Sequence, residues 1–322
     1  MTPPHTPSET PELLAPPPWT AQPERGSLFL LRVMTWISLR LGRRVGRWVL
    51  HPITLYFLLF SGAARAASRD YLRRVLGRKP GWRDGYRHIF TFAATIHDRV
   101  YLINDRYDLF DITIHNEQII HALLAEGRGA FLVGAHLGSF EVIHAMGRRH
   151  PHLRTAMVMF EENARKINSM LALINPALQH DIIALGHVDT MLKVRERLDE
   201  GTVLSMLADR TLDDDITFPA PLLGDDAAFP VGPFRMAALL RRPLIFMTGL
   251  YLGGNRYSIH FEPLADFSDL PATERDGAIQ AAITRYAALL EQYCRVAPYN
   301  WFNFFDFWRP RPSSRQRRNR HA

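Results

Sequence analysis

The chain has 322 residues, of which 47% are hydrophobic and 22% charged, the composition of an ordinary globular protein with room for one large domain and an appendage, or for two small domains. Its single cysteine, Cys294, excludes a disulfide within the chain and fits a reducing compartment. The formal net charge of +7 favours an anionic partner such as nucleic acid, an anionic lipid or an acidic protein.

Both ends of the chain have the composition of disordered segments. Residues 1–25 are rich in proline, serine and threonine. No apolar run follows a basic start there, so we expect no secretory signal. Residues 309–322 contain six arginines and no acidic residue, which predicts a disordered basic tail.

Residues 26–88 form a basic, apolar segment. Fourteen basic residues lie between Arg25 and Arg87, against two acidic ones, Asp70 and Asp84. These arginines flank apolar runs and no nucleic-acid-binding motif accompanies them, so we expect an anionic membrane surface and no nucleic acid as the partner.

Two apolar stretches, 28–41 and 48–64, lie within this segment. A membrane span requires about 20 apolar residues. The first stretch is too short, and the second contains His51 and Pro52. Tryptophans and tyrosines with flanking arginines suit helices at the membrane interface, so we expect an interfacial helical hairpin. One true span, or an ordinary buried helix pair, is the alternative.

Residues 89–308 have an alternating pattern of helices and strands, without an internal repeat. The expected helices are 87–104, 116–126, 141–149, 164–173, 189–199, 233–240 and 273–295, and the expected strands are 111–114, 129–135, 154–159, 181–184, 203–207, 244–250 and 257–261. Strands separated by short helices predict an α/β fold with a mostly parallel central sheet flanked by helices.

A histidine follows the buried strand expected at 129–135. His136 lies in a small-residue turn with Gly138, and Glu141 follows five positions later. Ligands bind at the carboxyl edge of such sheets. On one continuous helix the two side chains would point about 140° apart. With His136 in the turn and Glu141 in the first turn of the next helix, they can come into contact.

Such a pair has a recognised chemistry. A hydroxyl is a poor nucleophile unless a base takes its proton, and histidine suits that role. A carboxylate on the other ring nitrogen fixes the tautomer. No Gly-x-Ser-x-Gly sequence is present, so a serine acyl-enzyme is not indicated. Direct transfer to an acceptor hydroxyl follows, and a turn histidine that caps local backbone is the alternative.

We expect no metal site and no cofactor. His144, His150 and His152 are close in sequence but lack the spacing and the acidic partners of metal ligands.

Five segments in order resemble a known family. The His-x4-Glu arrangement after a strand is similar to that of the lysophospholipid acyltransferase superfamily. More narrowly, the chain resembles the bacterial lipid A biosynthesis (lauroyl and myristoyl) acyltransferases and the related phosphatidylinositol mannoside acyltransferase. The other matching segments are 201–210, 222–225, 229–233 and the basic apolar N-terminal helices. The resemblance covers about residues 26–308.

The resemblance implies the fold of glycerolphosphate acyltransferases, with 89–308 as the catalytic domain. It implies acyl transfer from acyl-acyl-carrier protein or acyl-CoA to a hydroxyl of a lipid or glycolipid, at the cytoplasmic face of the bacterial inner membrane. His136 would be the base and Glu141 its steering carboxylate, with no cofactor beyond the thioester. The further residues it implies for substrate binding are Arg165, Asp209, Arg210 and Asp225.

Two features differ from the lipid A branch. Arg210 follows Asp209, as in the mannoside branch, and residues 299–308 match the tryptophan-containing end of the family only loosely. The acceptor is therefore left open. Two other functions also compete: a non-catalytic membrane-bound lipid-binding protein of the same fold, and a thioester hydrolase that uses the same base.

Overall fold

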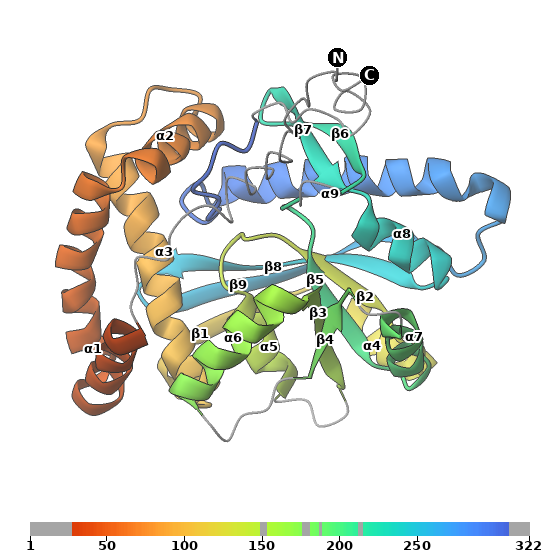
Figure 1. Cartoon of the computed structure of the whole chain (residues 1–322), viewed down its shortest axis with the longest axis horizontal. Coiled ribbons are helices and arrows are strands. Elements are labelled where there is room, and N and C mark those ends of the chain that lie inside the picture. The colour runs from red at the N-terminus through yellow and green to blue at the C-terminus, as the bar shows by residue number, and fades with distance from the viewer. Residues whose placement is uncertain (1–27, 149–152, 176–180, 187–188, 212–214, 309–322) are drawn as a thin grey trace, which may run out of the picture.

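The computed structural model describes residues 28–148, 153–175, 181–186, 189–211 and 215–308 (Figure 1). The helices are α1 (Leu28–Phe60), α2 (Gly62–Leu76), α3 (Trp82–Ile103), α4 (Glu117–Glu126), α5 (Phe140–Arg148), α6 (Glu161–Ile174), α7 (Thr190–Asp199), α8 (Gly232–Leu239) and α9 (Arg275–Val296). The strands are β1 (Asp111–His115), β2 (Phe131–Gly134), β3 (Thr155–Phe160), β4 (Ile182–Leu185), β5 (Val203–Leu207), β6 (Thr217–Leu222), β7 (Asp225–Pro230), β8 (Pro243–Gly253) and β9 (Arg256–Asp266).

Seven strands form the central sheet in the order β1-β9-β8-β2-β5-β3-β4. β8 and β9 are antiparallel, and every other neighbouring pair in this sheet is parallel. The predicted α/β fold with a mostly parallel sheet is therefore confirmed. β2 and β5 pair with Gly134 opposite Leu207, so the residues that follow these two strands emerge side by side at the carboxyl edge.

Each face of the sheet buries its own core, because alternate side chains along a strand point to opposite faces. Phe131 and Val133 pack with residues of α7, α8 and α9 in one cluster. Leu132 packs with residues of α3, α4 and α5 in a second cluster on the other face. Figure 1 shows α9 along one side of the sheet, and α3 and α5 on the other.

The hairpin of β6 and β7 is absent from the elements expected from the sequence. Its strands pair antiparallel, apart from the central sheet, and contain Pro219, Pro221 and Pro230. Prolines lack the amide hydrogen needed inside a sheet, which explains why the sequence does not indicate strands here. The hairpin turns at Leu223, whose amide donates to Glu291 Oε2 at 2.6 Å.

The N-terminal helices pack on the rest of the chain through α3. Because α3 begins at Trp82, the expected boundary at residue 88 lies inside this helix. α1 bends at Gly42, whose φ is 81°. None of the described helices has, on its own, the length and apolar content of a membrane span, and Met34–Phe60 and Gly62–Leu76 reach it only as a pair that meets at 94°.

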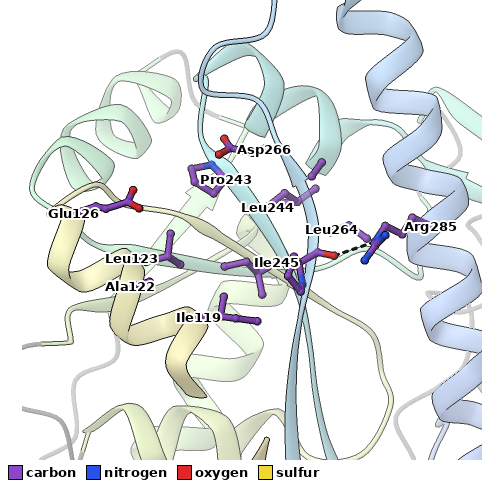
Figure 2. A pocket seen from close by; sticks show the side chains of 12 residues that line it. Ile119, Ala122, Leu123, Glu126, Pro243, Leu244, Ile245, Leu264, Asp266 and Arg285 are labelled. Atoms are coloured by element: carbon purple, nitrogen blue, oxygen red, sulfur yellow. Dashed lines mark hydrogen bonds between the residues drawn. The ribbon is translucent and has the colours of Figure 1, made fainter. Parts of the chain in front are cut away.

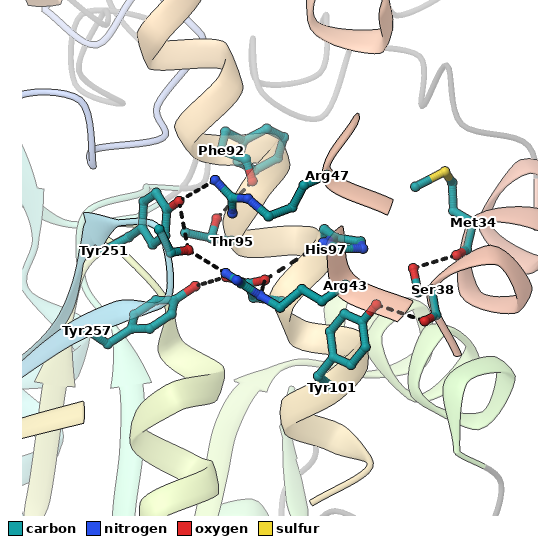
Figure 3. Close-up of polar contacts among 12 residues, drawn as sticks. Met34, Ser38, Arg43, Arg47, Phe92, Thr95, His97, Tyr101, Tyr251 and Tyr257 are labelled. Atoms are coloured by element: carbon teal, nitrogen blue, oxygen red, sulfur yellow. Dashed lines mark hydrogen bonds and ion pairs between the residues drawn. The ribbon is translucent and has the colours of Figure 1, made fainter. Parts of the chain in front are cut away.

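Some of the N-terminal arginines point inward rather than toward an external anion. Arg43 forms two hydrogen bonds of 2.7 and 2.8 Å with the fully buried carboxylate of Asp98, which also accepts from the Tyr257 hydroxyl. Arg47 donates to the Tyr251 hydroxyl at 2.8 Å. Figure 3 shows both arginines reaching from α1 toward the end of the β8–β9 hairpin, where Arg47 contacts Tyr251 and Arg43 donates to the Gly254 carbonyl at 2.5 Å. The two arginines therefore fasten α1 to the sheet.

The outer side of α1 exposes large apolar side chains. Trp48 is 75% and Phe60 63% exposed, and Trp36, Leu55 and Leu59 are also exposed. Residues 48, 55 and 59 recur at helical spacing and so share one face of α1 after its bend. These side chains form a contiguous apolar patch. Such patches mark interaction surfaces, whereas single exposed apolar residues do not.

Candidate active site

His136 lies in the tight turn between β2 and α5. Gly138 has a φ of 75°, and a Cβ there would lie 2.1 Å from the Gly249 carbonyl oxygen. Only glycine fits this position. The amide of Ser139 donates to the same carbonyl at 2.7 Å, which fixes the turn against β8. Glu141 lies in the first turn of α5, as predicted.

His136 contacts the carboxylate of Asp209, two residues beyond β5. Nδ1 of His136 lies 2.8 Å from Asp209 Oδ1, and the His136 backbone amide donates to Oδ2 at 2.9 Å. Asp209 is buried and the His136 side chain is 28% exposed. A carboxylate only accepts, so Nδ1 carries the proton and Nε2 presents its lone pair. No described residue is hydrogen-bonded to Nε2.

The charges around this pair favour neutral histidine and ionised aspartate. Burial lowers the pKa of His136, and the Arg210 guanidinium lowers it further, while Asp209 opposes both. Burial alone would raise the pKa of Asp209, but the contacts with His136 and the charge of Arg210 outweigh it and hold that pKa well below its usual range. The ring is therefore available as a base at neutral pH.

The carboxylate on Nδ1 is Asp209 rather than Glu141, which corrects the partner expected from the sequence. Glu141 instead forms an ion pair of 2.7 Å with Arg99 of α3. Arg99 is close enough to His136 to contribute to the lowering of its pKa. Glu141 thus neutralises a cation beside the histidine without contacting its ring. Asp209, for which the resemblance implies substrate binding, is buried and bonded to His136, Trp301 and Asn303.

Arg210 lies beside the pair and is held by the chain after α9. Its Nε donates to Asn303 Oδ1 at 2.9 Å, and its guanidinium lies 5.7 Å from the centre of the Phe305 ring. Burial lowers the pKa of Arg210 and Asp209 opposes this. The site therefore holds a partly buried cation close to the base.

Two other expected site residues lie elsewhere. Asp225 begins β7, is exposed and pairs with Arg74 of α2, and none of its described contacts links it to His136. Arg165 is exposed in the second turn of α6, which begins where β3 ends. Its helix therefore starts at the same carboxyl edge as His136, but no contact described here joins the two residues.

The segment after α9 supplies site residues that the sequence did not indicate. Trp301 Nε1 and Asn303 Nδ2 each donate to Asp209 Oδ2 at 2.9 Å. The backbone amide of Phe302 donates to the His136 carbonyl at 2.7 Å. In the sequence, this segment shows only a loose match to the tryptophan-containing end of the family. That match does not indicate which residues these side chains contact.

A pocket of about 450 Å³ lies away from this site (Figure 2). It is lined by α4, by the first residues of β8 from Pro243 and by the last residues of β9, with Arg285 at its rim. The His136 turn contacts β8 at Gly249, toward the other end of that strand. This pocket therefore does not serve the base. A second, mainly apolar groove runs between α4 and α5, with Leu132, Ile143 and Met247 among its lining residues.

Comparison with known proteins confirms the family that the sequence resembles. The family model described as "Bacterial lipid A biosynthesis acyltransferase" matches residues 23–310, most of the chain. No curated protein matches the chain significantly. With a match of this extent, the chain belongs to the bacterial lipid A biosynthesis acyltransferase family and is an enzyme that transfers an acyl group.

Proposed function

We propose that the enzyme transfers a fatty acyl group from acyl-acyl-carrier protein or acyl-CoA to a hydroxyl of a lipid or glycolipid acceptor, with His136 as the general base. The observation that carries this proposal is the pairing of Nδ1 with buried Asp209 at 2.8 Å, in a ring that is 28% exposed. A fixed tautomer with an open Nε2 is the arrangement that a general base requires.

In the proposed reaction, Nε2 of His136 takes the proton of the acceptor hydroxyl while its oxygen attacks the thioester carbonyl carbon. The C–S bond of the tetrahedral intermediate then breaks, and the thiolate leaves with the proton from the imidazolium. Asp209 stabilises the imidazolium between these steps. Every proton that His136 accepts is returned, so no cofactor is needed.

The cations near His136 support binding of negative charge. Arg210 is partly buried beside the base and is our candidate for stabilising the oxyanion of the intermediate. Arg165 is proposed to bind an anionic headgroup or the phosphate of the thioester carrier, because its helix begins at the same edge of the sheet.

The exposed apolar face of α1 supports a membrane location. We propose that Trp36, Trp48 and their apolar neighbours insert into the interface at the cytoplasmic face of the inner membrane. Exposed Arg40 and Arg44 would add an electrostatic contribution. Both substrates of the proposed reaction carry apolar chains, so a location at the bilayer surface would bring them to the site.

Lipid mass spectrometry of cells with and without the chain tests the proposal. Cells that express the chain should contain a lipid that carries one more acyl group, and His136→Ala should remove that species. A rise in free fatty acid without an acylated lipid would identify the thioester hydrolase. A lipid profile that is the same in all three cultures would favour the non-catalytic lipid-binding protein.

A further inference from the structure

We propose that Asn303 is a positioning residue that holds Asp209 and Arg210 in fixed places relative to His136. This inference rests on the proposed role of His136 as the base. Asn303 lies more than ninety positions from both residues and reaches them from the segment after α9.

The amide of Asn303 matches its two partners chemically. Its Nδ2 donates to Asp209 Oδ2 at 2.9 Å, and its Oδ1 accepts from Arg210 Nε at 2.9 Å. A carboxylate only accepts and a guanidinium only donates, so one orientation of the amide satisfies both. Asn303 is 2% exposed, so water does not replace either bond easily.

The backbone around Asn303 is fixed from both sides. Phe302 donates its amide to the His136 carbonyl at 2.7 Å, and the Asn300 carbonyl accepts from the Gly138 amide at 2.8 Å. The Trp301 carbonyl accepts from His88 Nε2 at 2.8 Å. The segment therefore keeps a constant register against the His136 turn, which a positioning residue needs.

The amide also affects the charge that His136 experiences. The charged groups on the elements around the ring are Asp209 and Arg210 after β5, Arg99 of α3, and Glu141 of α5, which pairs with Arg99. Oδ2 of Asp209 accepts three N–H bonds, one of them from Asn303. Each bond draws negative charge away from the side that faces His136. Without the amide, Asp209 would stabilise the imidazolium more strongly. Arg210 would lose the acceptor of its Nε and keep the longer bond from Nη2 to the Phe302 carbonyl, at 3.3 Å.

Two substitutions of the same shape test this role. Asn303→Leu removes both hydrogen bonds, and Asn303→Asp keeps an acceptor for Arg210 but removes the donor to Asp209 and adds a negative charge. Both substitutions should raise the pKa of His136 by about one unit, the shift expected from the loss of one hydrogen bond to a charged group. The shift should be larger in Asn303→Asp. We expect kcat to fall about tenfold or more, with a smaller change in KM.

The protonation of His136 can be measured without turnover. Diethyl pyrocarbonate modifies neutral imidazole, and mass spectrometry of the His136 peptide of the full chain gives its rate at each pH. The matched control is Tyr299→Phe, which loosens the same segment by removing the hydrogen bond from the Tyr299 hydroxyl to Asp84 and leaves the donors to Asp209 in place. The control should lower the melting temperature without moving the His136 titration.

An unchanged His136 titration in both Asn303 variants would overturn the positioning role, even if kcat fell together with thermal stability. A shifted titration in a chain that transfers no acyl group would refute the proposed function but support the positioning of Asp209 and Arg210. A shift of equal size in Tyr299→Phe would also overturn the proposal, because general loosening of the segment would then explain it.

Discussion

Asp209 Oδ1 lies 2.8 Å from Nδ1 of His136, although the two residues are 73 positions apart and follow different strands. The parallel register that sets Gly134 opposite Leu207 brings them together, since each lies two residues beyond its strand's paired residue. The sheet itself therefore assembles the base and its carboxylate.

We expect Asp209→Asn to lower kcat about 10⁴-fold, as loss of the correct histidine tautomer does in hydrolytic triads. Three N–H donors converge on Oδ2, so the new amide nitrogen would avoid that position and lie toward Nδ1. The proton of the ring would then move to Nε2, and His136 could no longer accept one. Steady-state kinetics checks this.

The matched control for that variant is Asp225→Asn, which removes a carboxylate that pairs with Arg74. Its kcat should stay close to that of the wild type. The opposite order, with Asp225→Asn more damaging than Asp209→Asn, would show that the wrong carboxylate has been assigned to His136.

Glu141→Gln should lower kcat about tenfold, because an unpaired Arg99 cation would disfavour the imidazolium that forms during the reaction. Adding Arg99→Gln should restore part of the rate, since the excess positive charge is then gone. A double-mutant cycle in kcat measures this coupling. If Glu141→Gln raised KM for the thioester donor and left kcat unchanged, Glu141 would be a binding residue instead.

Arg43→Gln should destabilise the protein by about 3–5 kcal/mol, because it leaves the buried Asp98 carboxylate without its cation. The control is Arg44→Gln at the exposed neighbouring position, which should change stability by less than about 0.5 kcal/mol. Urea unfolding of the two variants gives both values. Equal stability of the two would mean that the Arg43 contact does not fasten α1 to the sheet.

The exposed face of α1 should bind vesicles of phosphatidylethanolamine and phosphatidylglycerol. Trp36→Ser with Trp48→Ser should weaken flotation at both low and high salt, because the apolar contribution does not depend on salt. Arg40→Gln with Arg44→Gln should weaken it at low salt, by about fivefold per arginine, and much less at high salt.

A suitable control for the vesicle experiment is Leu239→Ser, which removes an exposed apolar side chain of α8. This variant should float like the wild type. Equal loss of binding in Leu239→Ser and in the double tryptophan variant would mean that α1 is not the membrane-binding face.

The sequence predicts local features well and long-range partners poorly. His136, its glycine turn and the start of α5 follow from neighbouring residues, so they could be expected. Asp209, rather than Glu141, contacts the His136 ring because of the register between β2 and β5. No local sequence pattern indicates that register. Asn303 joins the site only because the chain after α9 returns to the His136 turn.

The basic N-terminal segment gives a second example. Its arginines look alike in the sequence, and all of them suit an anionic surface. In the structure Arg43 and Arg47 contact Asp98 and Tyr251, whereas Arg40 and Arg44 are exposed. Which arginines face outward depends on the bend of α1 and on its packing against α3, and neither follows from composition.

Acyl transfer by the purified full chain, with and without His136, tests the central claim most directly. The chain, reconstituted in phospholipid vesicles, would receive an acyl-acyl-carrier protein and the acceptor lipid that the comparison of cells identifies, and mass spectrometry would measure the acylated lipid over time. The wild type should add one acyl group to the acceptor, and His136→Ala should do so about 10²–10⁴ times more slowly while keeping the same melting temperature. Transfer by His136→Ala at the wild-type rate would contradict the assignment of His136 as the base.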